Sequence, residues 1–353
     1  MDGAGDIAGI SIPFVCGVAL AAAVQMPPGA AYAVAGVSLP LCFAIGTFCI
    51  TGRRGAYAYA LLYFCLGMFC RISCGICGAQ SLPRPQGTFA LCDLIDSAGF
   101  KGEDTAALLK ALLTGNRSDL APGVKSAFRG SGASHILALS GLHLGIIYAI
   151  LRKALAWTGN SRAGMAARSV VIIAISGFYV LVTGASASIV RAFIFILLGE
   201  IAGLRRDRRK RPLATFCTAA TVQLAFNPTL ISSAAFQLSY LAMLGIMLLF
   251  PRLDGWYAAG GRFDPVKKIW TSMAMSISCQ VFTAPVVWIR FQSFPKYFLL
   301  ANLIALPLAE GLIISALVTL ALTAAGIGHG LAAGASDFLA GALIRALEII
   351  SSM

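Results

Sequence analysis

Two of the three histidines fall in one short stretch that also carries serine and glycine, and side-chain chemistry is first suggested there. The stretch runs from Ser131 to Gly145 and reads SGASHILALSGLHLG. His135, Ser140 and His143 place polar groups at the mouth of a long apolar run. A histidine in such a place usually satisfies a buried hydrogen bond, and the alternative is that it lines or gates a pore.

A charged side chain, Arg191, lies inside another apolar run, just after the small residues Ser186 and Ser188. An arginine near mid-membrane costs about 2.5 to 3.5 kcal/mol on insertion scales, so it needs water, an anion or a partner. Glu200 follows in the same run, but at 1.5 Å per residue it lies about 13 Å along a helix, too far for a direct bridge. Glu310 on another run is the better candidate partner.

Further amides and hydroxyls lie in apolar runs, where each alone usually joins two helices by a hydrogen bond. Those that we single out are Gln237, Ser239, Gln280 and Asn302. Prolines interrupt the later runs at Pro285, Pro295 and Pro307. Together these features favour a polar path between helices over a fully dry bundle.

The composition predicts a membrane protein and excludes a large soluble domain. Of 353 residues 58% are hydrophobic and 12% are charged, whereas soluble domains carry about 25% charged residues. Roughly eleven runs approach the 20 or so apolar residues that a spanning helix needs. We predict an all-α, polytopic transmembrane helical bundle of about eleven spans with short amphipathic interfacial helices. The predicted regions are a three-span N-terminal region (1–79), a short extracytoplasmic segment (80–130) and a main transmembrane domain (131–353).

Basic residues set the predicted orientation, because cytoplasmic loops are enriched in Lys and Arg. The densest cluster is RRDRRKR at positions 205–211, which we place in the cytoplasm together with the N-terminus. The first span is expected to be retained. The apolar runs nearest the polar residues are predicted at 169–182, 188–204, 230–250, 269–289 and 297–325.

Two amphipathic helices are predicted before the histidine stretch. Acidic residues open the first, which continues through Leu113 and ends at Gly115 and Asn116. The second is expected to be capped by Ser118 or Asp119, with apolar residues at spacing four on one face. That face is formed by Leu120, Val124 and Phe128, and Pro122 is tolerated in the first turn.

Most of the ten cysteines lie in apolar runs, where they behave as small hydrophobic residues. We expect no disulfide framework, no metal site and no cofactor. A nucleotide-binding loop is missing, so energy for any transport is expected to come from other chains.

Several segments together resemble the competence domain of the ComEC family of DNA-uptake channels. The matching segments are LLKALLTGNRSDL followed by ASHILALSGLHLG, then VTGASASIVRA, then FNPTLISSAAFQLSYLAMLGI, then QVFTAPVVWIRFQSFPKYFLLANLIALPL. They occur in the family's order and cover roughly Glu103 to Ala325. Each is modest alone, and their order makes the resemblance specific.

The resemblance implies a bacterial inner-membrane channel, not an enzyme, that passes single-stranded DNA to the cytoplasm during natural transformation. Implied partners are the single strand, membrane lipid, and a DNA receptor, a nuclease and an ATP-driven translocase supplied by other chains; a homo-oligomer stays open. Arg191, His143 and the amides suit a path for a polyanion. Larger family members carry an OB-like and a metallo-β-lactamase-like domain, and we expect neither here.

Two other functions stay open. A secondary transporter for a small anion would use a buried arginine and broken helices equally well. An intramembrane serine hydrolase is suggested by Gly184-Ala185-Ser186 with His143 on another run. No acid is visible to orient that histidine, and the histidine precedes the serine, opposite to the rhomboid order. We therefore expect no catalytic residue.

Overall fold

The computed structural model describes residues 3–24, 53–77, 86–138, 140–159, 161–204, 212–258, 264–292, 296–328 and 330–353. Every regular element among these residues is a helix, so the all-α prediction is confirmed. The chain divides into two compact units, residues 1–82 with 194–240, and residues 83–193 with 241–353. The three regions expected from the sequence stay a prediction.

The first unit is built on two helices that approach each other at glycines. Helix α1 (Gly3–Ala23) packs along α3 (Arg53–Cys77) and also contacts α10 (Pro212–Phe226). A Cβ atom at Gly17 would lie 2.0 Å from the carbonyl oxygen of Phe64, so only glycine permits this backbone contact. Small residues serve in this way where membrane helices pack closely.

A buried hydrogen bond joins two other helices of this unit, α10 and the start of α11 (Ala234–Leu248). The Tyr240 hydroxyl donates to Oε1 of Gln223 at 2.8 Å, and both side chains are buried. Tyr240 belongs to α11, which follows the short helix η3 (Pro228–Ser232). The apolar run at 230–250 is therefore not one helix, because Ser233 is extended and its hydroxyl accepts the Phe236 amide to start α11.

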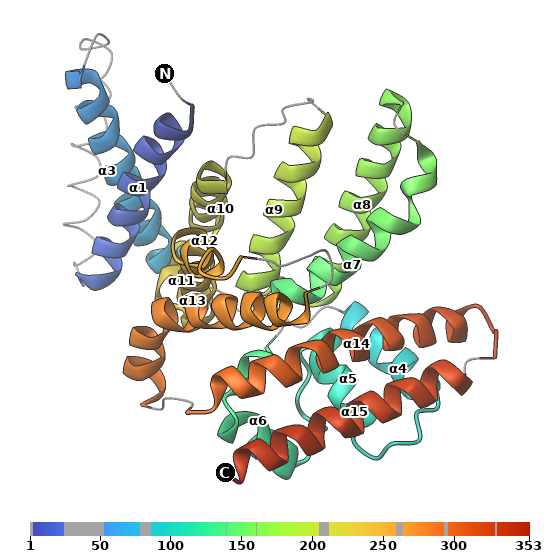
Figure 1. Cartoon of the computed structure of the whole chain (residues 1–353). Helices are drawn as coiled ribbons and strands as arrows, with labels where there is room; N and C mark the ends of the chain where they lie inside the picture. Colours follow the sequence, from blue (N-terminus) through green and yellow to red (C-terminus); the bar gives the residue numbers. More distant parts are fainter. Residues whose placement is uncertain are drawn as a thin grey trace. The chain divides into compact units, whose positions relative to one another are not determined.

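The second unit contains most of the remaining helices. In chain order they are α4 (Gln86–Ser97), α5 (Thr105–Thr114), α6 (Pro122–Gly130), η1 (Ala133–His135), α7 (Gly141–Ala154), η2 (Ala156–Thr158), α8 (Arg162–Val182), α12 (Phe250–Asp254), α13 (Pro265–Phe291), α14 (Phe298–Ala324) and α15 (Gly330–Ser351). Helix α9 (Ala187–Leu204) begins in this unit. Helices α14 and α15 lie side by side, with α4, α5 and α6 packed against them (Figure 1).

The largest hydrophobic core of the described residues joins α4, α5 and α6 to α14 and α15. Leu108, Leu109 and Leu112 on α5 are fully buried, as are Leu312 on α14 and Leu343 on α15. Burying a leucine side chain in this way contributes about 1.5 to 3 kcal/mol. The apolar face that makes α5 amphipathic is thus covered by protein.

The ends of these helices agree with the predictions in part. Helix α5 ends at Gly115, whose φ of 75° is the left-handed conformation that glycine adopts easily. Helix α6 begins with Pro122 in its first turn, as expected, but the predicted cap is wrong. Its N-cap is Ala121, because the helix begins only at Pro122, after both predicted caps.

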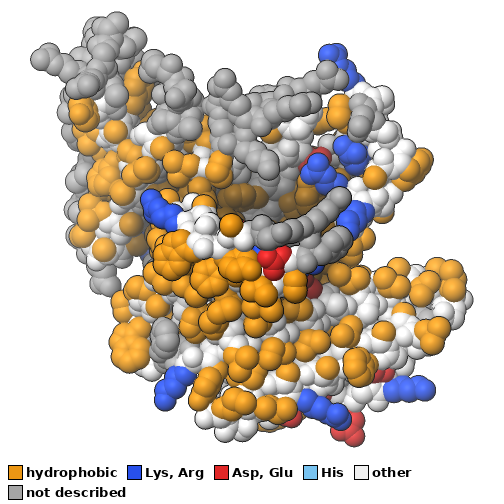
Figure 2. Space-filling model, viewed as in Figure 1, with side chains coloured by type: hydrophobic (Ala, Val, Ile, Leu, Met, Phe, Trp, Pro, Cys, Tyr) orange, Lys and Arg blue, Asp and Glu red, His pale blue; other side chains and the backbone are white. Residues whose placement is uncertain are grey.

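Four helices among the described residues are long and apolar enough to cross a membrane, namely α8, α9, α13 and α14. Each lies where the sequence predicts a span. Figure 2 shows hydrophobic side chains over much of the visible face, and large ones such as Phe178 and Ile289 are about 70% exposed. Apolar exposure on this scale marks a surface that meets lipid or protein. The count of eleven spans stays a prediction. One of the apolar runs in that count, at 30–50, and the basic cluster at 205–211 lie outside the described residues.

Candidate functional site

The histidine stretch forms the capped start of α7. Ser140 is extended, and its hydroxyl oxygen accepts a hydrogen bond from the Leu142 amide at 3.3 Å. The Ser140 amide donates in return to Nδ1 of His143, also at 3.3 Å. His143 is only 1% exposed, so its ring closes a reciprocal cap that satisfies backbone donors. The donor is a backbone N–H, so Nδ1 is the acceptor nitrogen of this ring.

The next residue, Gly141, brings α7 against α9. A Cβ atom there would lie 3.1 Å from Cβ of Ala192, 3.4 Å from Nη2 of Arg191 and 3.7 Å from the Ser188 carbonyl oxygen. Two stretches singled out in the sequence, about 50 residues apart, therefore meet at a position without a side chain. By contrast a Cβ atom at Gly145, one turn further along α7, would contact nothing within 4 Å.

The turn between α8 and α9 explains the Gly-Ala-Ser sequence. Gly184 and Ala185 have φ angles of 79° and 51°. The Ala185 amide donates to the Val180 carbonyl, and the Gly184 amide donates to the Leu181 carbonyl. This hydrogen-bond pattern is a Schellman motif, which ends helices at a glycine. Gly184 is thus accounted for by ending α8, without a catalytic serine.

Two further stretches reach the Arg191 side chain or its neighbours. Cys279 in α13 lies within electrostatic range of the Arg191 charge. Cys279 also lies 3.9 Å from the Ala242 carbonyl oxygen of α11. A Cβ atom at Gly245 would lie 2.2 Å from the Ser278 carbonyl oxygen, which shows that α11 and α13 touch through their backbones. We call Gly141, Ser188, Arg191, Ala192 and Cys279 the arginine cluster.

Two polar atoms of residues near this cluster in the sequence are buried without a hydrogen bond to any described residue. They are Oγ of Ser186 and Nε2 of Gln280. In hydrocarbon such groups are costly, so they are usually paired or face a polar path. Arg191 itself is half-buried in α9.

The other predicted path residues lie on several different elements. His135 is exposed in η1, with Nδ1 at 3.2 Å from the Gly132 carbonyl oxygen. Asn302 on α14 is half-buried, and its Oδ1 accepts no hydrogen bond from the part of the chain that the structure describes. Gln237 donates to the Ile231 carbonyl at 2.8 Å, and Gln237, Ser239 and Glu200 belong wholly to the first unit.

The two carboxylates expected to pair with Arg191 are both placed by the structure, but no ion pair with Arg191 is shown for either. Glu200 is buried on α9. Glu310 is exposed on α14 and forms no ion pair with another described residue. Their pairing with Arg191 stays a prediction.

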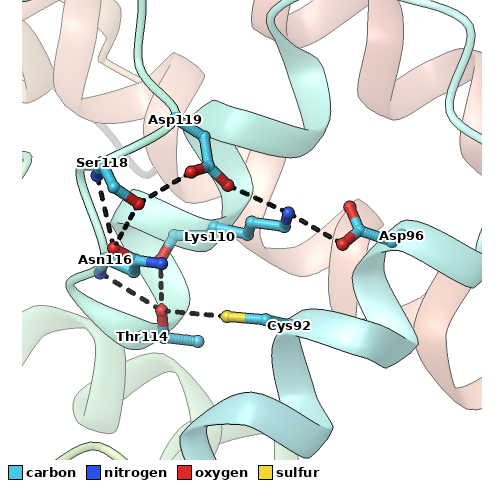
Figure 3. Close-up of polar contacts among 7 residues, drawn as sticks. All are labelled: Cys92, Asp96, Lys110, Thr114, Asn116, Ser118 and Asp119. Atoms are coloured by element: carbon cyan, nitrogen blue, oxygen red, sulfur yellow. Dashed lines mark hydrogen bonds and ion pairs between the residues drawn. The ribbon is translucent and has the colours of Figure 1, made fainter.

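A polar network that the sequence analysis missed fixes the segment before the histidine stretch. Lys110 bridges two carboxylates, Asp96 at 2.8 Å and Asp119 at 3.1 Å (Figure 3). Hydrogen bonds from Ser118 and Lys110 hold the pKa of Asp119 below its usual value. Arg117 donates from Nε to the Leu137 carbonyl oxygen at 3.2 Å. A backbone carbonyl acceptor leaves no signal in the sequence, so this link could not be predicted.

The chain is similar to two curated competence proteins. It is 27% identical over 205 residues to ComE operon protein 3 of Bacillus subtilis (strain 168), which covers 58% of this chain and 25% of that protein. It is 25% identical over 209 residues to competence protein ComA of Neisseria gonorrhoeae, which covers 58% of this chain and 28% of the relative. The matches thus span about a quarter of each relative's length.

No solved structure matches the chain. The family model described as Competence protein matches residues 112–353. This range includes α6 to α15 and all of the arginine cluster, and the resemblance expected from the sequence motifs is confirmed. The chain belongs to the competence protein family.

Proposed function

We propose that the chain is an inner-membrane channel through which single-stranded DNA enters the cytoplasm during natural transformation. The observation that carries this proposal is the arginine cluster: a half-buried guanidinium in an apolar helix, beside the bare backbone of Gly141. A polyanion cannot cross hydrocarbon, so its path needs positive and polar groups that hold phosphates weakly. The similarity to two competence proteins supports the same role.

Gly141 gives this site its specific geometry. With hydrogen as its side chain, Gly141 lets the α7 backbone come close to Nη2 of Arg191 and to Cβ of Ala192. The cap of Ser140 and His143 fixes where α7 begins and therefore where Gly141 lies. We assign His143 a positioning role for the path and not a role in proton transfer.

A serine hydrolase finds little support in the same geometry. Oγ of Ser186 has no hydrogen-bond partner among the described residues, whereas an activated serine needs a base within about 2.6 to 3.2 Å. The candidate base, His143, has its Nδ1 engaged with the Ser140 amide. We propose that the chain is not an enzyme, and that a DNA receptor, a nuclease and an ATP-driven translocase are separate chains.

The proposal is tested by complementation. A strain lacking the chain receives the wild type, Arg191→Glu or the matched control Arg345→Glu, whose arginine is exposed on the apolar helix α15. We expect the wild type and the control to restore cytoplasmic accumulation of labelled DNA, and Arg191→Glu to abolish it at equal membrane levels. Wild-type DNA entry with Arg191→Glu would contradict the proposal.

A structural pairing and a small-anion transporter predict other results. If Arg191 only pairs with Glu310, the double change Arg191→Glu with Glu310→Arg recovers both protein level and DNA entry. If the substrate is a small anion, anion uptake into proteoliposomes depends on Arg191 and DNA entry does not.

A further inference from the structure

The second unit contains an apolar groove between α4, α5, α7, α8 and α14. Its volume is about 520 Å³, and none of its lining side chains is charged. Representative lining residues are Leu91 of α4, Ile150 of α7, Phe178 of α8 and Leu320 of α14. The one polar lining side chain, Tyr179, donates its hydroxyl hydrogen to the Leu113 carbonyl at 3.0 Å. The groove thus offers no free donor or cation, so it suits neither DNA nor a nucleotide.

The mouth of the groove lies on a surface of a membrane-capable helix. Ile175 and Phe178 line the groove and are themselves 40% and 69% exposed. They belong to α8, which also exposes Val170 and Leu181 and is long and apolar enough to span a membrane. In a membrane this face meets hydrocarbon chains, so the groove opens toward lipid.

The α7 wall of the groove ends at a boundary of basic and aromatic residues. Leu151 lines the groove, and the exposed residues Arg152 and Lys153 follow it directly. Nη1 of Arg152 donates to the Tyr148 hydroxyl at 2.6 Å, and Trp157 is 82% exposed in η2. Basic residues with exposed tryptophan are typical of the membrane–water interface. Phospholipid phosphates lie at this depth.

We propose that the groove holds an acyl chain of a membrane phospholipid, with its headgroup beside Arg152 and Lys153. The acyl chain fills a groove that five helices line, so it differs from the lipid that surrounds any membrane protein. The bound acyl chain contacts both the α4–α5 segment and α8, and therefore helps to hold these helices together. The groove shares no lining residue with the arginine cluster, and this inference does not depend on the passage of DNA.

The test uses the full chain in nanodiscs that contain phosphatidylglycerol with a diazirine at mid-chain. We expect illumination to label peptides from α4, α7 and α8. Ala90→Phe fills the groove from α4, and should lower this labelling severalfold. Ala335→Phe makes the same change at an exposed alanine of α15 outside the groove, and should leave the labelling unchanged.

If the Ala90→Phe protein is not recovered in the membrane, Ile150→Phe fills the groove from the opposite wall. Equal labelling in the filled and control variants would overturn the proposal, because surrounding lipid would then explain the signal. Protein–protein crosslinks at these helices in place of lipid adducts would also overturn it, since a second copy would occupy the groove. Labelling by a free diazirine fatty acid alone would overturn the assignment to a phospholipid.

Discussion

Replacing Gly141 with leucine tests whether the contact between α7 and α9 shapes the site. A first side-chain carbon there would lie 3.1 Å from Cβ of Ala192 and 3.4 Å from Nη2 of Arg191, and leucine adds three more carbons. Overfilling a packed contact costs about 1 to 3 kcal/mol. A free energy of that size shifts the population of the native contact by about 5- to 150-fold.

The matched control is Gly145→Leu, because a Cβ atom at Gly145 meets nothing within 4 Å. Gly141 is the first residue of α7, whereas Gly145 lies one turn inside it, so only Gly145→Leu gains the full interior helix propensity of about 0.8 to 1 kcal/mol. A loss of function seen only with Gly141→Leu therefore points to the contact with α9. Transformation frequency is measured together with membrane protein level. We expect Gly141→Leu to lose DNA entry and Gly145→Leu to retain it. Equal DNA entry in the two variants would refute the reasoning.

Three further predictions concern charge, protonation and the serine. Arg191→Lys should keep partial DNA entry if a point charge suffices, and lose it if the two-pronged hydrogen bonding of a guanidinium is needed. Arg208→Glu should only reduce entry, because the sequence places this residue in a water-exposed cluster where ions screen its charge. Asp119→Asn should lower the melting temperature at pH 7. The pKa of the Asp119 carboxyl is lowered in the folded protein, so its ionised form, paired with Lys110, stabilises the fold at pH values above the usual pKa. That difference should vanish as the pH falls through the folded pKa, and a constant difference down to pH 2 would show that the charge is irrelevant. Ser186→Ala should leave function near wild type, and covalent capture of Ser186 by a fluorophosphonate probe would revive the hydrolase.

Runs of apolar residues predict the positions of the long helices well, because whether a helix suits lipid depends on its local composition alone. The run at 188–204 differs by one residue from α9, and the run at 297–325 by one residue at each end from α14. The run at 230–250 was wrongly predicted as one helix, because hydropathy does not detect the cap at Ser233 that starts α11. The cap predicted at Ser118 or Asp119 was wrong because α6 begins later, at Pro122, and Asp119 pairs with Lys110.

The site was predictable as a list of polar residues but not as an arrangement. The sequence singles out His143 and Arg191, and the contact of Gly141 with Arg191 depends on how α7 packs against α9. Such a contact between distant segments has no signature in local spacing. The link from Arg117 to the Leu137 carbonyl and the apolar groove escape prediction for the same reason.

The most direct measurement of the central claim is a crosslink between the entering strand and the arginine cluster. A photo-reactive amino acid is placed at Ser188, in the cluster, or at Val170, which is 64% exposed on α8. Cells take up radiolabelled DNA and are illuminated during uptake. We predict transfer of label to the chain from position 188 and not from position 170. Label from neither position, or equal label from both, would contradict the assignment of the DNA path to the arginine cluster.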